Sequence, residues 1–166
     1  MRHLIVTGLA AATLLATVGP AQAHSTRENN ARERCVMVTK AQVEGMFTNF
    51  NAAWATKNPQ TVTNLFAPDA VLLATVSNTP RTTPLLIKDY FETFLKNSPV
   101  GPIDSSTTTM GCNTATRVGT WTVALTNPTT KAVTNVKARY SFIYRYARDG
   151  WKIYHLHSSM MPEPTS

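Results

Sequence analysis

Two histidines, His155 and His157, stand two residues apart near the end of the chain. In an extended strand, residues two apart share a face, so this pair lies on the same face as Trp151 and Ile153. Such imidazoles can bind an anion, move a proton or ligate a metal ion. A metal site needs at least a third ligand, and no partner stands at a suitable spacing, so we predict no metal. The pair is a candidate for ligand binding or acid–base catalysis, and two structural histidines are the alternative.

A third candidate is the cationic side chain of Arg139, in the stretch of alternating residues that precedes the histidines. The alternation places it with Ser141, Ile143 and Arg145 on one face of a strand, opposite a row of aromatic side chains. A guanidinium on a cavity wall would bind a carboxylate or a phosphate through two parallel hydrogen bonds. The alternative is an arginine exposed on the surface, where most arginines are found.

Three more candidates lie in or shortly after a turn-rich segment in the middle of the chain. Asn78 and Arg81 lie between a predicted strand and a predicted helix, where a long side chain could reach the mouth of a cavity. Tyr90, in that helix, is their possible companion. The alternative is an ordinary turn asparagine and a tyrosine whose hydroxyl reaches the surface of an amphipathic helix.

Other catalytic chemistry has little support in the residues. Asp69 and Asp149 stand at turns and Asp89 lies in a predicted helix, so none is an obvious buried base. A cofactor-free isomerase, lyase or oxidoreductase would therefore have to use His155 or His157. The chain has no Gly-x-Ser-x-Gly motif and no dinucleotide-binding glycine loop, and we predict no cofactor.

The start of the chain has the organisation of a secretory signal peptide. Arg2 and His3 precede an apolar run from Leu4 to Val18, and small residues follow up to Ala23. The apolar run is shorter than the roughly 20 residues that span a bilayer, so we expect no stable membrane insertion. We predict a signal peptide over 1–23, a mobile leader over 24–34, one domain over 35–162 and a tail over 163–166. The mature protein would be secreted or periplasmic.

The net charge of the chain, and its distribution, indicate which class of partner it could bind. Sixteen Lys and Arg against nine Asp and Glu give a formal net charge of +7. These basic residues are scattered, without a dense run or an aromatic-interleaved stripe, so nucleic-acid binding is not predicted. A small anionic molecule is the ligand that we expect.

The chain has only two cysteines, Cys35 and Cys112. Export would place them in an oxidising compartment, where a disulfide between them can persist. The bridge would tie the segment before the first helix to the middle of the domain. Two buried free thiols are the alternative.

The order of predicted elements is helix, helix, strand, helix and then four strands. A capping box at Thr39 and Gln42 begins a helix that runs to Lys57; a second helix runs from Pro59 through Phe66 and a third begins at Pro84. The predicted strands cover 70–76, 105–112, 118–125, 133–146 and 151–158. Helices followed by an antiparallel meander indicate an α+β fold with the helices on one face of the sheet. A curved sheet covered in this way forms a cone with a cavity between the layers.

The stretch Ala138 to Pro162, ARYSFIYRYARDGWKIYHLHSSMMP, resembles the closing hairpin of the association domain of calcium/calmodulin-dependent protein kinase II and its bacterial relatives. Further likeness lies in Val71 to Thr82, Asp89 to Phe91 and Gly111 to Asn113. These resemble a secreted bacterial branch, labelled as oxidoreductases, of the NTF2-like (SnoaL-like) superfamily. The resemblance covers 35–162. It implies a cone of three N-terminal helices packed on a curved antiparallel or mixed sheet, a pocket, and self-association through the sheet as a homodimer or larger ring.

The resemblance does not imply a kinase. The chain lacks a Gly-rich phosphate loop, a catalytic Asp loop and a metal-binding Asp-Phe-Gly, and neither long predicted helix is a basic calmodulin target. The kinase association domain has an arginine-rich pocket, a role that the resemblance carries to Arg139; the arginine after its two histidines is Ser158 here. Our leading hypothesis is an exported, self-associating domain that binds a small anion in its cone. The alternatives are the cofactor-free enzyme and a purely structural oligomerisation module.

Overall fold

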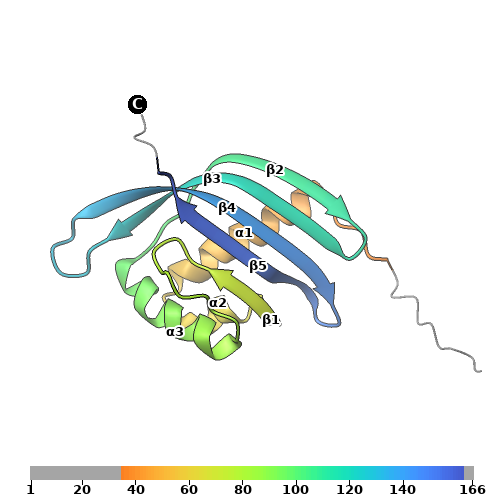
Figure 1. Ribbon diagram of the computed structural model, residues 1–166, viewed down its shortest axis with the longest axis horizontal. Helices are drawn as coiled ribbons and strands as arrows, with labels where there is room; N and C mark the ends of the chain where they lie inside the picture. The colour runs from red at the N-terminus through yellow and green to blue at the C-terminus, as the bar shows by residue number, and fades with distance from the viewer. Residues whose placement is uncertain (1–34, 163–166) are drawn as a thin grey trace, which may run out of the picture. The chain divides into compact units, whose positions relative to one another are not determined.

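The computed structural model describes residues 35–162 (Figure 1). The predicted signal peptide, leader and tail lie outside the described residues. Along the chain the elements are α1 (Lys40–Ala55), α2 (Pro59–Thr63), β1 (Phe66–Leu73), α3 (Pro84–Phe94), a 3₁₀ turn η1 (Leu95–Asn97), β2 (Ile103–Gly111), β3 (Thr114–Thr126), β4 (Val133–Ala147) and β5 (Gly150–Met160). The predicted order of helices and strands is confirmed.

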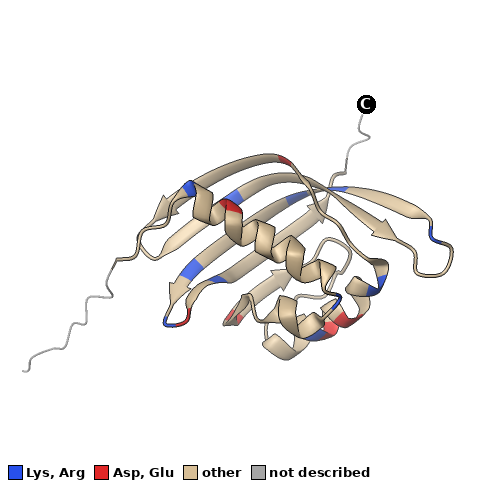
Figure 2. Cartoon of the chain, turned by 180° about the vertical axis from the view of Figure 1, so that it is seen from behind, with Lys and Arg blue, Asp and Glu red and all other residues tan. Residues whose placement is uncertain are grey.

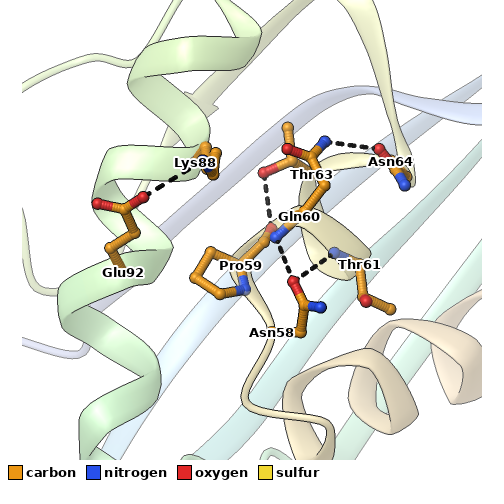
Figure 3. Close-up of polar contacts among 8 residues, drawn as sticks. All are labelled: Asn58, Pro59, Gln60, Thr61, Thr63, Asn64, Lys88 and Glu92. Carbon is orange, nitrogen blue, oxygen red and sulfur yellow. Dashed lines mark hydrogen bonds and ion pairs between the residues drawn. The ribbon is translucent and has the colours of Figure 1, made fainter.

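Each helix begins at the cap that its sequence predicts. At α1 the Thr39 hydroxyl accepts from the Gln42 amide at 3.2 Å, while the Gln42 side chain accepts from the Thr39 amide at 2.8 Å. At α2 the Asn58 side chain accepts from two backbone amides ahead of it (Figure 3). Thr83 caps α3 in the same manner. These side chains satisfy the free N–H groups of the first helical turns.

The boundary between α2 and β1 differs from the prediction. The sequence predicts a helix through Phe66 and a strand from Ala70, but α2 ends at Thr63 and β1 already begins at Phe66. Pro68 lies inside this strand, where it cannot donate a ladder hydrogen bond. The pairing of β1 with β5 is irregular between Phe66 and Val71, and this irregularity accommodates the proline.

The five strands form one mixed sheet in the order β1-β5-β4-β3-β2, in which β1 runs parallel to β5 and the other pairs are antiparallel. The sheet is curved, and the helices lie on one side of it (Figures 1 and 2). The inner residues of β4 are buried: Ala138, Tyr140, Phe142 and Tyr144. The α+β fold with helices on one face of a curved mixed sheet is therefore confirmed.

Aromatic side chains fill the space between the layers. Phe47 and Phe50 on α1 place their ring centroids 5.6 and 5.2 Å from that of Phe142 on the sheet. Trp54, one turn further, contacts Trp121 of β3 at 5.6 Å. Burial of these rings, with their edge-to-face contacts, fastens α1 to the sheet.

Cys35 and Cys112 form a disulfide, with their Cα atoms 5.1 Å apart. Beside it, Asn113 accepts a hydrogen bond from the Val36 amide through its side chain at 2.8 Å and donates its own amide to the Val36 carbonyl at 3.1 Å. The segment before α1 is thus held to the turn between β2 and β3. No helix of residues 35–162 is long and apolar enough to cross a membrane.

Candidate functional site

Arg139 and His157 lie on the outer face of the sheet, away from the helices. Cross-strand pairing places Arg139 opposite Ser159 and Ser141 opposite His157, and all of these side chains alternate with the buried inner row. The sequence left open which face of these strands lines the interior of the cone, and the structure places these side chains on the other face. The physical reason is that the large rings of the aromatic residues of β4 occupy its inner positions.

Two adjoining depressions lie in this part of the outer face. One, of about 340 Å³, is lined by Arg139, Tyr140, Ser141, His157 and Ser159. The other, of about 220 Å³, lies beyond the end of β1, where the segment Leu73–Pro80 turns away from β5. His157 and Ser159 line both, and Asn78 lines the second. The structure thus brings together three of the predicted site residues: Asn78, Arg139 and His157.

The lining of these depressions suits an anion. None of the residues that line either one is acidic. Arg139 supplies a guanidinium with several N–H donors, and the serine hydroxyls and Asn78 amide supply neutral donors. A carboxylate or phosphate oxygen could therefore be held here by charge-assisted hydrogen bonds.

His155 lies on the same outer face, one step further along β5, opposite Val71 on one side and Ile143 on the other. A shift in the register of β4 and β5 at this point separates it from Ile153, which is buried, so the prediction that these two residues share a face is wrong. Burial lowers the pKa of His155, and the neighbouring His157 acts in the same direction. The imidazole therefore stays uncharged to a lower pH than a free histidine does. His155 lines neither depression.

Arg81 and Tyr90 lie apart from this site. The Arg81 backbone pairs with Leu72 at 2.8 and 2.9 Å, and its Nη1 lies 3.4 Å from Oδ2 of Asp89. Tyr90 is 9% exposed and stacks on Phe94 with 5.2 Å between ring centroids, so burial raises its pKa. The contact between Arg81 and Asp89 links the segment after β1 to α3, and Tyr90 is part of the buried core. Neither residue lines either depression.

Ser158 points inward between the two outer residues His157 and Ser159. Its Oγ accepts from the Thr75 hydroxyl at 2.6 Å and from the Trp121 indole Nε1 at 3.0 Å. This serine joins the loop after β1 to β3 and β5. It forms the buried floor beside the smaller depression.

Sequence reasoning missed one cationic side chain, Arg117 of β3. Arg117 is 7% exposed, on the inner face of the sheet. Its Nε donates to the Ser106 hydroxyl at 2.8 Å, and its guanidinium lies 4.9 Å from the centroid of the Phe47 ring. The signal was present in the sequence, because Arg117 falls on the same alternation as the buried Ala115 and Trp121.

Among residues 35–162, no three His, Cys, Asp or Glu side chains gather closely enough to hold a metal ion.

The arrangement of three helices on one side of a curved, five-stranded mixed sheet is that of the NTF2-like class of α+β proteins. Within that class the chain belongs to the calcium/calmodulin dependent protein kinase II association domain family, whose model matches residues 39–162. The helix-and-sheet domain accounts for all of the matched residues.

Solved structures agree with this assignment. A Xanthomonas campestris protein assigned to the calcium/calmodulin dependent protein kinase II association domain is 41% identical, with 74% of this chain and 88% of that chain covered and a TM-score of 0.72. An NTF2-like protein with a cystatin-like fold from Novosphingobium aromaticivorans is 10% identical, covering 75% and 83%, with a TM-score of 0.63. A ketosteroid isomerase-like protein from Erwinia carotovora is 15% identical, covering 74% and 96%, with a TM-score of 0.61. The last two share the fold. No curated protein sequence matches the chain.

Proposed function

We propose that this protein binds a small anionic molecule on the outer face of its sheet, at Arg139 and His157. The observation that carries the proposal is that Arg139, His157 and Ser159 line one depression without an acidic side chain. Asn78 adds an amide from the adjoining depression. A guanidinium and two or three neutral donors are the groups that recognise a carboxylate or a phosphate.

The proposal includes self-association and export. The chain belongs to a family named for association, and among the described elements no helix covers the outer face of the sheet. A second copy packed against this face would enclose the depressions and strengthen the hydrogen bonds to an anion by excluding water. Export is supported by the signal-peptide pattern of residues 1–23, and the Cys35–Cys112 disulfide is compatible with it.

Calorimetric titration tests the binding. Inorganic phosphate and succinate are titrated into the protein and into Arg139→Met and His157→Asn variants. We expect one or both anions to bind, and the Arg139→Met variant to bind at least about tenfold more weakly, because it loses a charge-assisted pair. Arg148→Met is the matched control, since this exposed arginine lies in the turn before β5 and lines neither depression.

The proposal fails if neither anion binds, or if both anions bind the Arg139→Met variant as tightly as the parent protein. Sedimentation equilibrium tests the association, which should weaken when Val118, 40% exposed on the same face, is replaced by Lys. A monomer at every concentration would contradict self-association.

A further inference from the structure

The two depressions on the outer face differ in the chemistry of their linings. The residues that line them, all of which lie within 35–162, include one arginine, Arg139, and no lysine, aspartate or glutamate. Arg139 belongs to the larger depression, over β4 and β5. The smaller one, at the end of β1, is lined instead by the Asn78 amide and by hydroxyl groups that include those of Thr79 and Ser159. A ligand that fills both therefore meets a positive charge at one end and neutral polar groups at the other.

The neutral groups of the smaller depression can accept hydrogen bonds as well as donate them. The Asn78 amide has both an N–H₂ and a carbonyl, and each hydroxyl can act in either direction. An ionised carboxylate only accepts, so it would leave these acceptors unused. A hydroxyl group on the ligand uses both. Pro80 and Met160 add apolar surface, against which the C–H groups of a sugar ring can pack.

The segment that carries Asn78 is held in place by hydrogen bonds of the protein. At its base the backbones of Leu72 and Arg81 pair at 2.8 and 2.9 Å. Further along, the Thr75 hydroxyl donates to the Ser158 hydroxyl at 2.6 Å, which attaches the segment to β5. A polar group on a segment that is already ordered costs less entropy when a ligand binds to it.

The two depressions are neighbours across β5, which lies between β1 and β4 in the sheet (Figure 1). His157 and Ser159 of β5 line both of them. Adjacent strands are about 4.8 Å apart, so the lines of β4 and β1 are separated by about 10 Å. A hexose-sized ring with a carboxylate, with one hydrogen bond at each end, covers that distance. Together the depressions have the size of a small-molecule site, roughly 300–1,000 Å³.

We propose that the ligand of this outer site is a sugar acid, with its carboxylate on Arg139 and its hydroxyls at Asn78, Thr79 and Ser159. The inference rests on the proposed function and narrows the anion to one chemical class. A single guanidinium balances the single charge of a carboxylate, whereas a phosphate monoester carries about −1.5 to −2. The carboxylate supplies the charge-assisted pair, and the hydroxyls supply selectivity over other small acids.

Calorimetric titration of three matched ligands tests the class. Glucuronate has a six-membered ring, hydroxyls and a carboxylate; cyclohexanecarboxylate keeps the ring and the carboxylate without hydroxyls; glucose keeps the hydroxyls without the charge. We expect glucuronate to bind the parent protein at least about tenfold more tightly than either of the others. Arg139→Met should weaken the binding of both acids by at least about tenfold, because both lose the guanidinium.

The Asn78→Ala variant separates the hydroxyl contacts from the charge. It should weaken glucuronate binding about five- to tenfold and leave cyclohexanecarboxylate and succinate within about twofold, because neither of these acids has a hydroxyl to lose. Thr79→Val, which removes one hydroxyl and keeps the shape, should weaken glucuronate about threefold. Both residues are exposed, so both variants should fold. Asn135→Ala is the matched control, since this exposed asparagine of β4 lines neither depression.

The inference is overturned if cyclohexanecarboxylate or glucose binds as tightly as glucuronate, if Asn78→Ala weakens all the acids equally, or if Asn135→Ala has the same effect as Asn78→Ala. In each of these cases, binding of phosphate or succinate that depends on Arg139 would still support the proposed function. If phosphate, succinate and glucuronate all fail to bind, the proposed function and this inference are overturned together.

Discussion

Polar side chains on the two faces of the sheet differ in whether they form hydrogen bonds within the protein. On the inner face, Tyr140 donates its hydroxyl to the Ser105 carbonyl at 3.0 Å and Ser158 accepts two hydrogen bonds, so these polar side chains have partners within the protein. On the outer face, the side chains of Arg139 and His157 are exposed to solvent. Polar residues are therefore structural on one face, while on the other they are available for a partner. Arg117 belongs with the inner group, since its Nε donates to the Ser106 hydroxyl.

The largest difference between the faces should appear in packing. Phe142→Ala removes a fully buried ring that contacts Phe47 and Phe50 across the layers. We expect it to lower the free energy of unfolding by about 3–5 kcal/mol, through lost burial and the cavity left behind. Val133→Ala, on the outer face at the start of β4 and 60% exposed, should change it by no more than about 0.5 kcal/mol. Urea unfolding measures both, and equal losses would contradict the division between the faces.

A smaller effect should separate two adjacent serines. Ser158→Ala removes the acceptor of the half-buried Thr75 hydroxyl and of the buried Trp121 indole N–H. We expect a loss of about 1–3 kcal/mol in the free energy of unfolding. Ser159→Ala, one residue on and pointing to the outer face, should cost about 0.5 kcal/mol or less. The comparison breaks down if the two variants are equally stable in urea.

The smallest effect concerns an ion pair at the outer surface. Arg145 donates to both carboxylate oxygens of Asp69, at 2.7 and 2.8 Å, and this contact lowers the pKa of Asp69 below its ordinary value of 3.8. Because the folded-state pKa is depressed, the stabilisation is present above pH 3.8 and is lost as the pH falls through the lower, folded value. Solvent screening keeps it small.

Thermal unfolding between about pH 6 and about pH 2 tests this pair. Asp69→Asn should lower the melting temperature slightly at the upper end of this range and should make its decline in acid shallower. The control is the double variant Asp69→Asn, Arg145→Met. Its melting temperature should fall in acid in the same way as that of Asp69→Asn alone, because Arg145 has no carboxylate partner left to lose. An unchanged acid profile in Asp69→Asn would show that the pair contributes nothing.

The starts of the helices could be predicted from the sequence because capping residues act on backbone groups only a few positions away. Thr39 with Gln42, Asn58 with Pro59 and Thr83 with Pro84 begin the helices at the predicted places. The start of β1 was missed because Pro68 indicates a break, whereas the parallel partner strand holds the chain extended on both sides of it.

The sequence predicted which residues of the candidate site share a strand face, but not on which side of the sheet they lie. Alternation shows that Arg139 shares a face with Ser141 and opposes Tyr140, but not which face the helices cover. The predicted third strand began at Val118, one residue after Arg117, because a charged side chain does not look like a core residue. The burial of Arg117 depends on Ser106 from another strand and Phe47 from α1.

The sequence by itself determined the helix caps, the strand alternation, the two cysteines available for a bridge and the family to which the chain belongs. These follow from short-range hydrogen bonding and side-chain periodicity, which the order of residues specifies directly. Only the tertiary structure decided that Arg139 and His157 lie outside, beside Asn78, and that Arg117 lies inside. The reason is that a site is made by residues far apart in the chain, and the packing of the aromatic rings against α1 decides which face of each strand is buried.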